Sequence, residues 1–317
     1  MSETELIIAI PSKGRLKEQV EEWLGDCGLD LAVSGGARGY LAGLKGLPGA
    51  QVRLLSAGDI AEALGAGEAH LGVTGEDLLR ERGDLDARAL LLRPLGFGRA
   101  DLVVATPKSW LDVDTMADLE EVAHDYLART GRRMRVATKY LAQTRSFFAR
   151  HGVVDYRITE SGGATEGAPA SGAAELVVDI TTTGATLAAN GLKVLSDGLI
   201  LRSQAQLAAS LKAVWSADHL ATAERLLRTV EARAAAIASA TLVWPATGAA
   251  AETAAVERLV ADGALRRPNG LMIEAGRAAG AAQALTAAGL GPVTVSRPEF
   301  VFEVESPAFT ALKHRVL

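Results

Sequence analysis

Short apolar runs alternate with amphipathic stretches along the first two thirds of the chain, and this alternation determines the expected fold. Leu6–Ile10 and Leu102–Ala105 have the length of buried strands, whereas Arg15–Cys27 repeats its apolar residues at helical spacing. The other expected elements here are the strands Val52–Leu55, Leu71–Thr74, Arg135–Ala137, Tyr156–Thr159 and Glu175–Ile180 and the helix Gln143–His151. Strands that alternate with helices indicate an α/β fold with mostly parallel sheets covered on both faces.

Proline and glycine residues interrupt the chain between Arg93 and Ala100, after the first group of elements. Such residues favour a crossing between units, and a second alternating series follows. We therefore expect two lobes with a cleft between them, the first comprising residues 1–95 and 188–220 and the second residues 96–187. Open α/β sheets bind ligands outside the carboxyl ends of their strands, so the cleft is the expected position of the functional site.

The remaining residues, 221–317, predict a small α+β domain. A long alanine-rich helix is expected over residues 211–240, and shorter elements follow it. These are the strands Thr241–Trp244, Leu271–Glu274, Val293–Ser296 and Phe300–Val304 and the helices Ala250–Ala261 and Arg277–Ala288. Nothing in this segment has the pattern of a catalytic site.

The segment from Leu176 to Leu187 carries the most distinctive chemistry of the chain. Its apolar strand ends in Asp179, and the turn Thr181-Thr182-Thr183-Gly184-Ala185-Thr186 follows. Such a turn presents N–H groups and hydroxyls to a phosphate at the positive end of a helix, and Asp179 is suited to sugar hydroxyls or to Mg²⁺. The arrangement suits a phosphorylated sugar such as phosphoribosyl pyrophosphate (PRPP). A plain helix N-cap after a strand gives the same pattern.

A second turn of this kind follows the first predicted strand and contains Lys13, Gly14 and Arg15. Two cations and a glycine at a strand-to-helix turn suit a phosphate-rich ligand, because Lys and Arg add charge to the amides at the helix N-terminus. The alternative interpretation is a solvated basic turn. It is not a P-loop, since the chain lacks GxxxxGK[ST].

Two further turns bring hydroxyl and carboxylate groups to strand ends. Thr74 and Gly75 precede two acids, which also occur at helix starts simply to complement the helix dipole. Glu166 lies in a turn one helix and one strand before Asp179, so both carboxylates can lie along the same sheet edge, near a sugar or a metal ion.

Composition narrows the class of protein. The 317 residues are 49% hydrophobic, and the net charge is -5. This acidic balance does not indicate binding to nucleic acid or to an anionic membrane surface. No apolar run reaches the roughly 18 residues of a membrane span, and the acidic N-terminus lacks the pattern of a secretory signal. A cytoplasmic protein is expected. Cys27, the single cysteine, lies on an apolar helical stripe and is expected to be a core thiol.

Four segments, in order, resemble the ATP phosphoribosyltransferase family, whose enzymes open histidine biosynthesis. They are Ala9–Leu16, Gly72–Leu79, Arg135–Tyr140 and Gly163–Pro169, the last continuing through Val178-Asp179 to Leu192. The resemblance implies two periplasmic-binding-protein-like catalytic lobes, the second of which binds PRPP. It also implies Mg²⁺-dependent attack by N1 of ATP on C1 of PRPP, with release of pyrophosphate, and a homo-oligomer, either a dimer or a hexamer.

The resemblance also assigns roles to residues. Thr183–Thr186 would hold the 5-phosphate, with Thr182 counted as a further substrate-binding residue. Asp179 would contact the ribose, and Glu166 would lie by the ribose and the metal ion. Lys13–Arg15 would face nucleotide or pyrophosphate groups, with Arg15 counted as catalytic, and Thr74–Gly75 would line the cleft. Such a reaction needs no protein nucleophile, because positioning and electrostatic stabilisation supply most of the catalysis.

Three departures from the family pattern stand out. His70 occupies a position where the family usually has an acid, and Ser56–Asp59 lacks an arginine often found there. The length suggests the family's long form, whose third domain binds histidine as a feedback inhibitor, yet Phe300–Leu317 does not follow the usual regulatory pattern.

Two other functions fit parts of the chain. Phosphoribosyltransferases acting on orotate or purine bases also place TTGxT after an acidic strand, but usually with two adjacent acids instead of Val178-Asp179. A non-catalytic sensor of the periplasmic-binding type would use the same cleft, although it has little use for several phosphate-suited turns.

Overall fold

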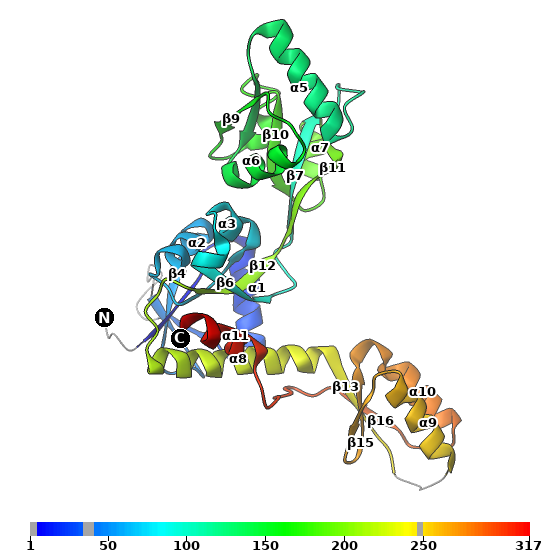
Figure 1. Ribbon diagram of the computed structural model, residues 1–317. Coiled ribbons are helices and arrows are strands. Elements are labelled where there is room, and N and C mark those ends of the chain that lie inside the picture. The colour runs from blue at the N-terminus through cyan, green and yellow to red at the C-terminus, as the bar shows by residue number, and fades with distance from the viewer. Residues whose placement is uncertain (1–4, 34–40, 246–249) are drawn as a thin grey trace.

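The computed structural model describes residues 5–33, 41–245 and 250–317. Two α/β lobes, lobe I and lobe II, and a smaller α+β domain form the molecule, and the long helix α8 (Ala217–Ala238) runs from lobe I toward the C-terminal domain (Figure 1). Among the described helices, none is long and apolar enough to cross a membrane. The predicted α/β class with a small C-terminal α+β domain is confirmed.

Lobe I is built on a seven-stranded sheet in the order β2-β3-β4-β1-β5-β12-β6. Its strands are β1 (Leu6–Pro11), β2 (Leu31–Val33), β3 (Leu41–Leu44), β4 (Ala50–Leu55), β5 (Leu71–Gly75), β6 (Ala89–Pro94) and β12 (Ala205–Ser210). The central strands β4, β1 and β5 are parallel, whereas β12 runs antiparallel between β5 and β6. Its helices are α1 (Gly14–Asp26), α2 (Ala57–Ala66), α3 (Glu76–Glu81), α4 (Leu85–Arg88), α8 (Ala217–Ala238) and α11 (Pro307–Val316).

Helices cover both faces of this sheet, as the alternation of side chains in a strand requires. Ile8 and Ile10 of β1 belong to the core that β1 shares with α1, α8 and α11. Ala9, between them, belongs to the core on the other face, which α2 covers. Cys27 lies in the first of these cores, where burial raises the pKa of its thiol to about 11, so the predicted core thiol is confirmed.

Lobe II has a five-stranded sheet in the order β11-β7-β10-β8-β9. The strands are β7 (Ala100–Pro107), β8 (Met134–Thr138), β9 (Tyr156–Glu160), β10 (Leu176–Thr181) and β11 (Leu192–Ser203). Strands β10, β8 and β9 are parallel, whereas β7 and β11 are antiparallel to their neighbours. The helices are α5 (Met116–Thr130), α6 (Leu141–Arg150), the 3₁₀ turn η1 (Thr165–Gly167) and α7 (Ala185–Ala189).

The two lobes are joined where β6 passes into β7 and where β11 passes into β12. At this junction Ala205, the start of β12, pairs with Gly75, the end of β5. In lobe II, Ser203 of β11 pairs with Ala100 of β7, and Thr181 at the end of β10 pairs with Asp101. The carboxyl ends of the parallel strands in both lobes therefore lie at the junction, as expected for a site between the lobes.

The C-terminal domain has a four-stranded antiparallel sheet in the order β14-β15-β13-β16. Its strands are β13 (Ser239–Val243), β14 (Leu265–Arg267), β15 (Gly270–Glu274) and β16 (Thr294–Ser296), and its helices are α9 (Ala250–Ala261), the 3₁₀ turn η2 (Ala275–Arg277) and α10 (Ala278–Ala287). It has a core of its own.

The boundaries between these parts differ from those predicted. Residues 192–203 form β11 in the sheet of lobe II, so the chain returns to lobe I at residue 204 and not at 188. Val230 of α8 and Leu312 of α11 both lie in the core of lobe I, so the segment 221–317 is not one unit. The third domain is inserted between two helices of lobe I.

The strand expected over Phe300–Val304 does not form. This segment runs beside α8, where Val301 N–H donates to the carbonyl of Ala232. Arg228 donates to the carbonyls of Glu303 and Val304. Because helix groups satisfy its backbone, the segment does not need a strand partner.

Candidate active site

Asp179 lies near the carboxyl end of β10, half-buried, and its Oδ1 accepts a hydrogen bond from its neighbour's amide, Ile180 N, at 2.8 Å. Burial raises the pKa of the Asp179 carboxyl above its ordinary value, and the charge of Glu166 raises it further. The Ile180 amide and the Lys139 ammonium act in the opposite direction without cancelling this rise. A partly desolvated carboxylate gains most from hydroxyl donors or a cation.

Glu166 reaches this edge from η1, the 3₁₀ turn after β9. The residue two before it, Ala164, has a left-handed backbone with φ of 51°, an uncommon and strained conformation for a residue with a Cβ. Thr165 is buried and donates to Ser161 Oγ at 3.1 Å, which ties the turn to the end of β9. The turn thereby holds Glu166 close enough to Asp179 for its charge to act on that carboxyl.

Lys139 is a charged neighbour of Asp179 that the sequence interpretation did not select. It directly follows β8, the neighbour of β10, and its ammonium acts on Asp179 and lies 4.9 Å from the ring centroid of Tyr140. Lys13 was selected because two cations and a glycine occur together in its turn. The turn after β8 has a single cation, Lys139, and no glycine, so the same signal did not find it.

The turn after β10 is closed by hydrogen bonds between its own hydroxyls and amides. Gly184 adopts φ of 75°, and its N–H donates to Thr181 Oγ1 at 2.8 Å. Ala185 N–H makes a long contact of 3.4 Å with Thr183 Oγ1. Thr182 Oγ1 donates to the carbonyl of Arg99, at the crossing between the lobes, at 3.2 Å. The hydroxyls of Thr181 and Thr183 thus accept from the two amides that lead into α7.

On lobe I, Lys13, Gly14 and Arg15 are exposed at the carboxyl end of β1. Lys13 is the N-cap residue of α1, and Gly14 has φ of 77°, a left-handed conformation that favours glycine. Ser12 N–H donates to Leu55 O at 2.8 Å, which fixes the start of this turn to the end of β4. Both cations are therefore on the edge of lobe I that faces the junction.

Thr74 does not line the cleft as expected. Its side chain is fully buried and its hydroxyl donates to Ala57 O at 2.7 Å, so it fixes the start of α2 to the end of β5. Gly75 is half-buried at the strand end. A Cβ there would lie 2.3 Å from Asp77 Oδ1, so any other residue at this position would displace the Asp77 carboxylate.

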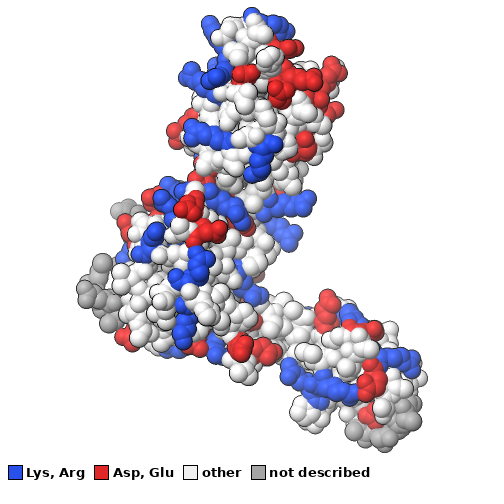
Figure 2. Space-filling view, viewed as in Figure 1, with Lys and Arg blue, Asp and Glu red and all other residues white. Residues whose placement is uncertain are grey.

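A hollow of about 500 Å³ lies at the junction of the lobes. Its lining includes Thr181 and Thr182 of the turn, and Arg99, Arg202 and Gln204 of the crossing strands. Figure 2 shows Lys and Arg side chains projecting where the two lobes meet. Of the residues predicted for the site, only Thr182 belongs to this lining, whereas Lys13 and Arg15 lie exposed at the edge of lobe I.

The two carboxylates fit a hard divalent cation when the ligand supplies the remaining oxygens. The charge of Glu166 acts on the Asp179 carboxyl, and Mg²⁺ is usually bound by one or two carboxylates with phosphates and water. Within the described ranges, no group of three or more His, Cys, Asp or Glu side chains has the arrangement of a metal site. A complete protein cage is therefore absent from the described residues.

Comparison with known proteins decides the family. The family model described as HisG, ATP phosphoribosyltransferase, matches residues 56–232. An ATP phosphoribosyltransferase of Caulobacter vibrioides is 67% identical over 304 residues, which is 96% of this chain and 95% of that protein. The chain belongs to the ATP phosphoribosyltransferase family. A Bradyrhizobium sp. enzyme of the same name is 58% identical over 232 residues, covering 73% of this chain and 71% of its own.

A solved structure agrees with the fold. The ATP phosphoribosyl transferase (HisG:HisZ) complex from Thermotoga maritima contains a chain that aligns with a TM-score of 0.55 at 24% identity. The alignment covers 71% of this chain and 96% of that chain. At this level of identity the likeness establishes a common fold.

Family membership fixes the reaction. An ATP phosphoribosyltransferase condenses ATP, through N1, with PRPP to give N1-(5-phosphoribosyl)-ATP and pyrophosphate, the first step of histidine biosynthesis. The family requires a divalent metal ion. The predicted phosphoribosyltransferase is confirmed, and the alternatives of a base-specific phosphoribosyltransferase and a non-catalytic sensor are set aside.

Proposed function

We propose that this ATP phosphoribosyltransferase binds PRPP on lobe II and ATP against the facing edge of lobe I. The observation that carries the proposal is the meeting of Asp179, Glu166 and Lys139 at the carboxyl edge of the lobe II sheet, beside the turn after β10. Carboxylates suit the ribose hydroxyls, and the turn suits a phosphate.

In the proposed complex, the turn from Thr182 through Thr183, Gly184, Ala185 and Thr186 holds the 5-phosphate of PRPP. The N–H groups in the first turn of α7 have no acceptor within the helix. The hydroxyls of Thr181 and Thr183 already accept from Gly184 and Ala185. Phosphate oxygens take over as acceptors for these amides, and the threonine hydroxyls are then free to donate to the same anion.

We assign Asp179 to the ribose hydroxyls and count Asp179, Glu166 and Arg15 as catalytic. The bond from C1 to the pyrophosphate oxygen breaks, the pyrophosphate keeps the electron pair, and N1 of the adenine forms the new bond to C1. Positive charge develops on the ribose, and nearby carboxylates stabilise it, while Arg15 stabilises the departing anion. Lys13, with the backbone of Gly14 and Gly75, lines the nucleotide side.

The proposed metal ion is Mg²⁺, and Glu166 and Asp179 are the residues that would hold it when PRPP is bound. When bound, it would neutralise charge on the leaving group. The half-buried Asp179 and the nearby Glu166 support this assignment, because a divalent cation relieves their mutual repulsion.

The test of the function is direct. Purified protein is mixed with ATP, PRPP and Mg²⁺ in the presence of pyrophosphatase, and the absorbance of the N1-ribosylated adenine is followed. Product formation that requires both substrates and the metal ion is expected. Replacement of Mg²⁺ by Ca²⁺ tests the ion, since Ca²⁺ prefers a larger and more flexible oxygen shell. Folded protein that forms no product contradicts the proposal.

Three further properties complete it. We propose that histidine inhibits the enzyme through the domain at residues 239–296, which has a core separate from the catalytic lobes. An inhibition curve flat to millimolar histidine would contradict this.

We propose that the protein is a homo-oligomer, either a dimer or a hexamer, and sedimentation as a monomer would refute it. A cytoplasmic location follows from the proposed substrates, ATP and PRPP, and fractionation of cells tests it.

A further inference from the structure

A buried contact joins the two lobes next to the candidate site. Asp77 of α3, in lobe I, is 5% exposed. Its Oδ2 accepts a hydrogen bond of 2.6 Å from the hydroxyl of Tyr140, a fully buried residue at the start of α6 in lobe II. Ser203, where β11 leaves lobe II, donates to Asp77 Oδ1 at 2.8 Å and accepts from Asp77 N at 3.0 Å.

Neighbouring residues extend this contact into a docking of α3 on the start of α6. Glu81 accepts hydrogen bonds from the backbone N–H groups of Ala142 and Gln143, at 2.8 and 3.2 Å. These are orphan donors of the first turn of α6, which an acid satisfies well. Gln143 Nε2 donates to the carbonyl of Asp77 at 2.9 Å. Each of these bonds runs between the lobes.

The polar character of the contact indicates a role beyond stability. Burying a carboxylate is costly unless its oxygens are hydrogen-bonded, and apolar packing of the same volume often stabilises a fold better. Hydrogen bonds, in contrast, fix geometry, because they weaken steeply with distance and angle. The Tyr140–Asp77 pair therefore suits the task of holding the lobes in one relative position.

Both partners lead directly into the site. Asp77 follows Thr74-Gly75 at the end of β5, and Gly75 lacks a Cβ that would lie 2.3 Å from Asp77 Oδ1. Tyr140 follows Lys139, whose ammonium lies 4.9 Å from the Tyr140 ring centroid, and Lys139 acts on Asp179. Asp77 is thus two residues from Gly75 in the chain, and Tyr140 is the direct neighbour of Lys139, so each end of the contact is joined to a residue of the candidate site.

We propose that the buried Tyr140–Asp77 hydrogen bond is a positioning element for the transfer reaction. It sets the separation between the ATP side on lobe I and the PRPP side on lobe II, and it fixes the ring against which Lys139 is held toward Asp179. Tyr140 and Asp77 touch neither substrate. The inference rests on the proposed division of substrates between the lobes.

Kinetics of Tyr140→Phe provide the first test, because this change keeps the ring beneath Lys139 and removes only the hydroxyl. We expect turnover to fall roughly ten- to hundredfold, since small misplacements of reacting groups have such effects. The dissociation constant of PRPP alone should stay within about twofold, because its contacts lie on lobe II. Tyr156→Phe, at the opposite end of β9 from the site, is the matched control and should keep wild-type turnover.

Distance measurements provide a second test that does not depend on activity. Spin labels on Glu22→Cys in α1 and Leu111→Cys in lobe II, both at exposed positions, report the separation of the lobes. The native Cys27 is buried and does not compete. We expect a narrow distance distribution in the otherwise wild-type protein and a broader one with Tyr140→Phe.

A pair of Asp77 variants covers the case in which Tyr140→Phe does not fold. Asp77→Asn keeps an oxygen acceptor for the tyrosine hydroxyl and should retain most of the turnover and the narrow distribution, whereas Asp77→Ala should lose both. Folded Tyr140→Phe or Asp77→Ala with wild-type turnover and an unchanged distribution overturns the proposal. An inactive wild-type protein would instead contradict the proposed function, and the distance distributions would still decide the role of the contact.

Discussion

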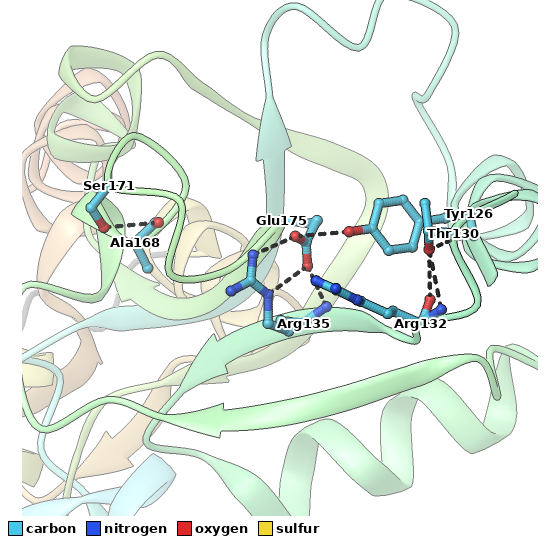
Figure 3. Close-up of polar contacts among 7 residues, drawn as sticks. All are labelled: Tyr126, Thr130, Arg132, Arg135, Ala168, Ser171 and Glu175. Carbon is cyan, nitrogen blue, oxygen red and sulfur yellow. Dashed lines mark hydrogen bonds and ion pairs between the residues drawn. The ribbon is translucent and has the colours of Figure 1, made fainter.

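Glu175 binds Arg135 through both of its carboxylate oxygens (Figure 3). Arg135 Nη2 lies 2.7 Å from Oε1, and Nε lies 3.2 Å from Oε2. The backbone N–H of Arg135 donates to Oε2 at 2.6 Å, and the Tyr126 hydroxyl to Oε1 at 3.3 Å. The pair joins β8 to the residue before β10, so it braces the two strands that carry Lys139 and Asp179.

Glu175→Gln should therefore lower the melting temperature by a few degrees near neutral pH. Burial alone would raise the pKa of Glu175, but the hydrogen bonds and charge of Arg135 lower it below its ordinary value of 4.5. A lowered carboxyl pKa gives stability that is present above that value and lost as the pH falls below it. The difference between variant and wild type should shrink in acid, and a difference independent of pH contradicts this account.

His70 should make folding stability depend on pH. Its Nδ1 accepts from Ile7 N at 3.0 Å, which assigns the proton to Nε2, 3.2 Å from Val214 O. Burial, and then the neighbouring ring of His219 and the charge of Arg53, lower its pKa from 6.5 to about 4. A histidine with a lowered pKa stabilises the fold above the unfolded value, and this stability is lost as the pH falls from 6.5 toward about 4.

Chemical denaturation checks the prediction for His70. Unfolding free energy should fall by about 1 kcal/mol between about pH 6.5 and about pH 5.5 from this group. In His70→Gln the fall of the unfolding free energy over the same pH interval should be smaller by this amount. Parallel slopes in the two proteins would show that the ring does not carry the effect.

Asp179→Asn should separate function from stability. We expect turnover to fall by about a hundredfold or more, because a charge placed for the transition state is removed. The melting temperature should stay or rise, since a carboxyl whose pKa burial raises is ionised at a cost near neutral pH. Asp125→Asn, on the exposed surface of α5, is the matched control. Turnover equal to wild type in Asp179→Asn would exclude this acid from the catalytic residues.

Gly184→Ala tests the phosphate turn. Gly184 and Gly131 have similar left-handed backbones, with φ of 75° and 68°, and nothing lies within 4 Å of a Cβ built on either. Each alanine substitution should cost about 1 kcal/mol of folding stability from backbone strain. Only Gly184→Ala should also weaken PRPP binding, measured by calorimetry. Equal PRPP affinities in the two variants would show that the turn does not contact PRPP.

Leu312→Ala tests the attachment of α11 to lobe I. Leu312 is fully buried in the core of that lobe, so its truncation should cost about 2–5 kcal/mol of unfolding free energy. Leu317→Ala, at a position that is 80% exposed, should cost little. A small loss for Leu312→Ala in urea denaturation would mean that α11 contributes little to the lobe.

Local patterns predicted much of the fold and the site, because they are set by residues close in sequence. The strand ends at Pro11, Gly75 and Thr181 lie within one residue of their predicted positions. Strand β11 was missed since Asp197-Gly198 breaks its apolar pattern, and its pairing with β7 shifts register there. That single omission displaced the predicted lobe boundary.

Contacts between segments far apart in the chain could not be predicted from local sequence patterns. Thr74 lies in the predicted turn, yet its partner Ala57 is supplied by the neighbouring strand-to-helix connection. The hydroxyl of Tyr140 can donate its hydrogen bond to Asp77 only when the two lobes are packed against each other. Periodicity identifies which residues are polar at a strand end, whereas tertiary packing decides which of them face the ligand.

The place of α11 has a consequence for how the protein is made. The core of lobe I includes Ile8 near one end of the chain and Leu312 near the other, and the whole C-terminal domain is inserted between α8 and α11. During translation, β1 leaves the ribosome long before α11 exists. Part of the apolar surface of lobe I therefore stays uncovered until α11 has been synthesised. By then, the strands of lobe II and of the inserted domain have already left the ribosome.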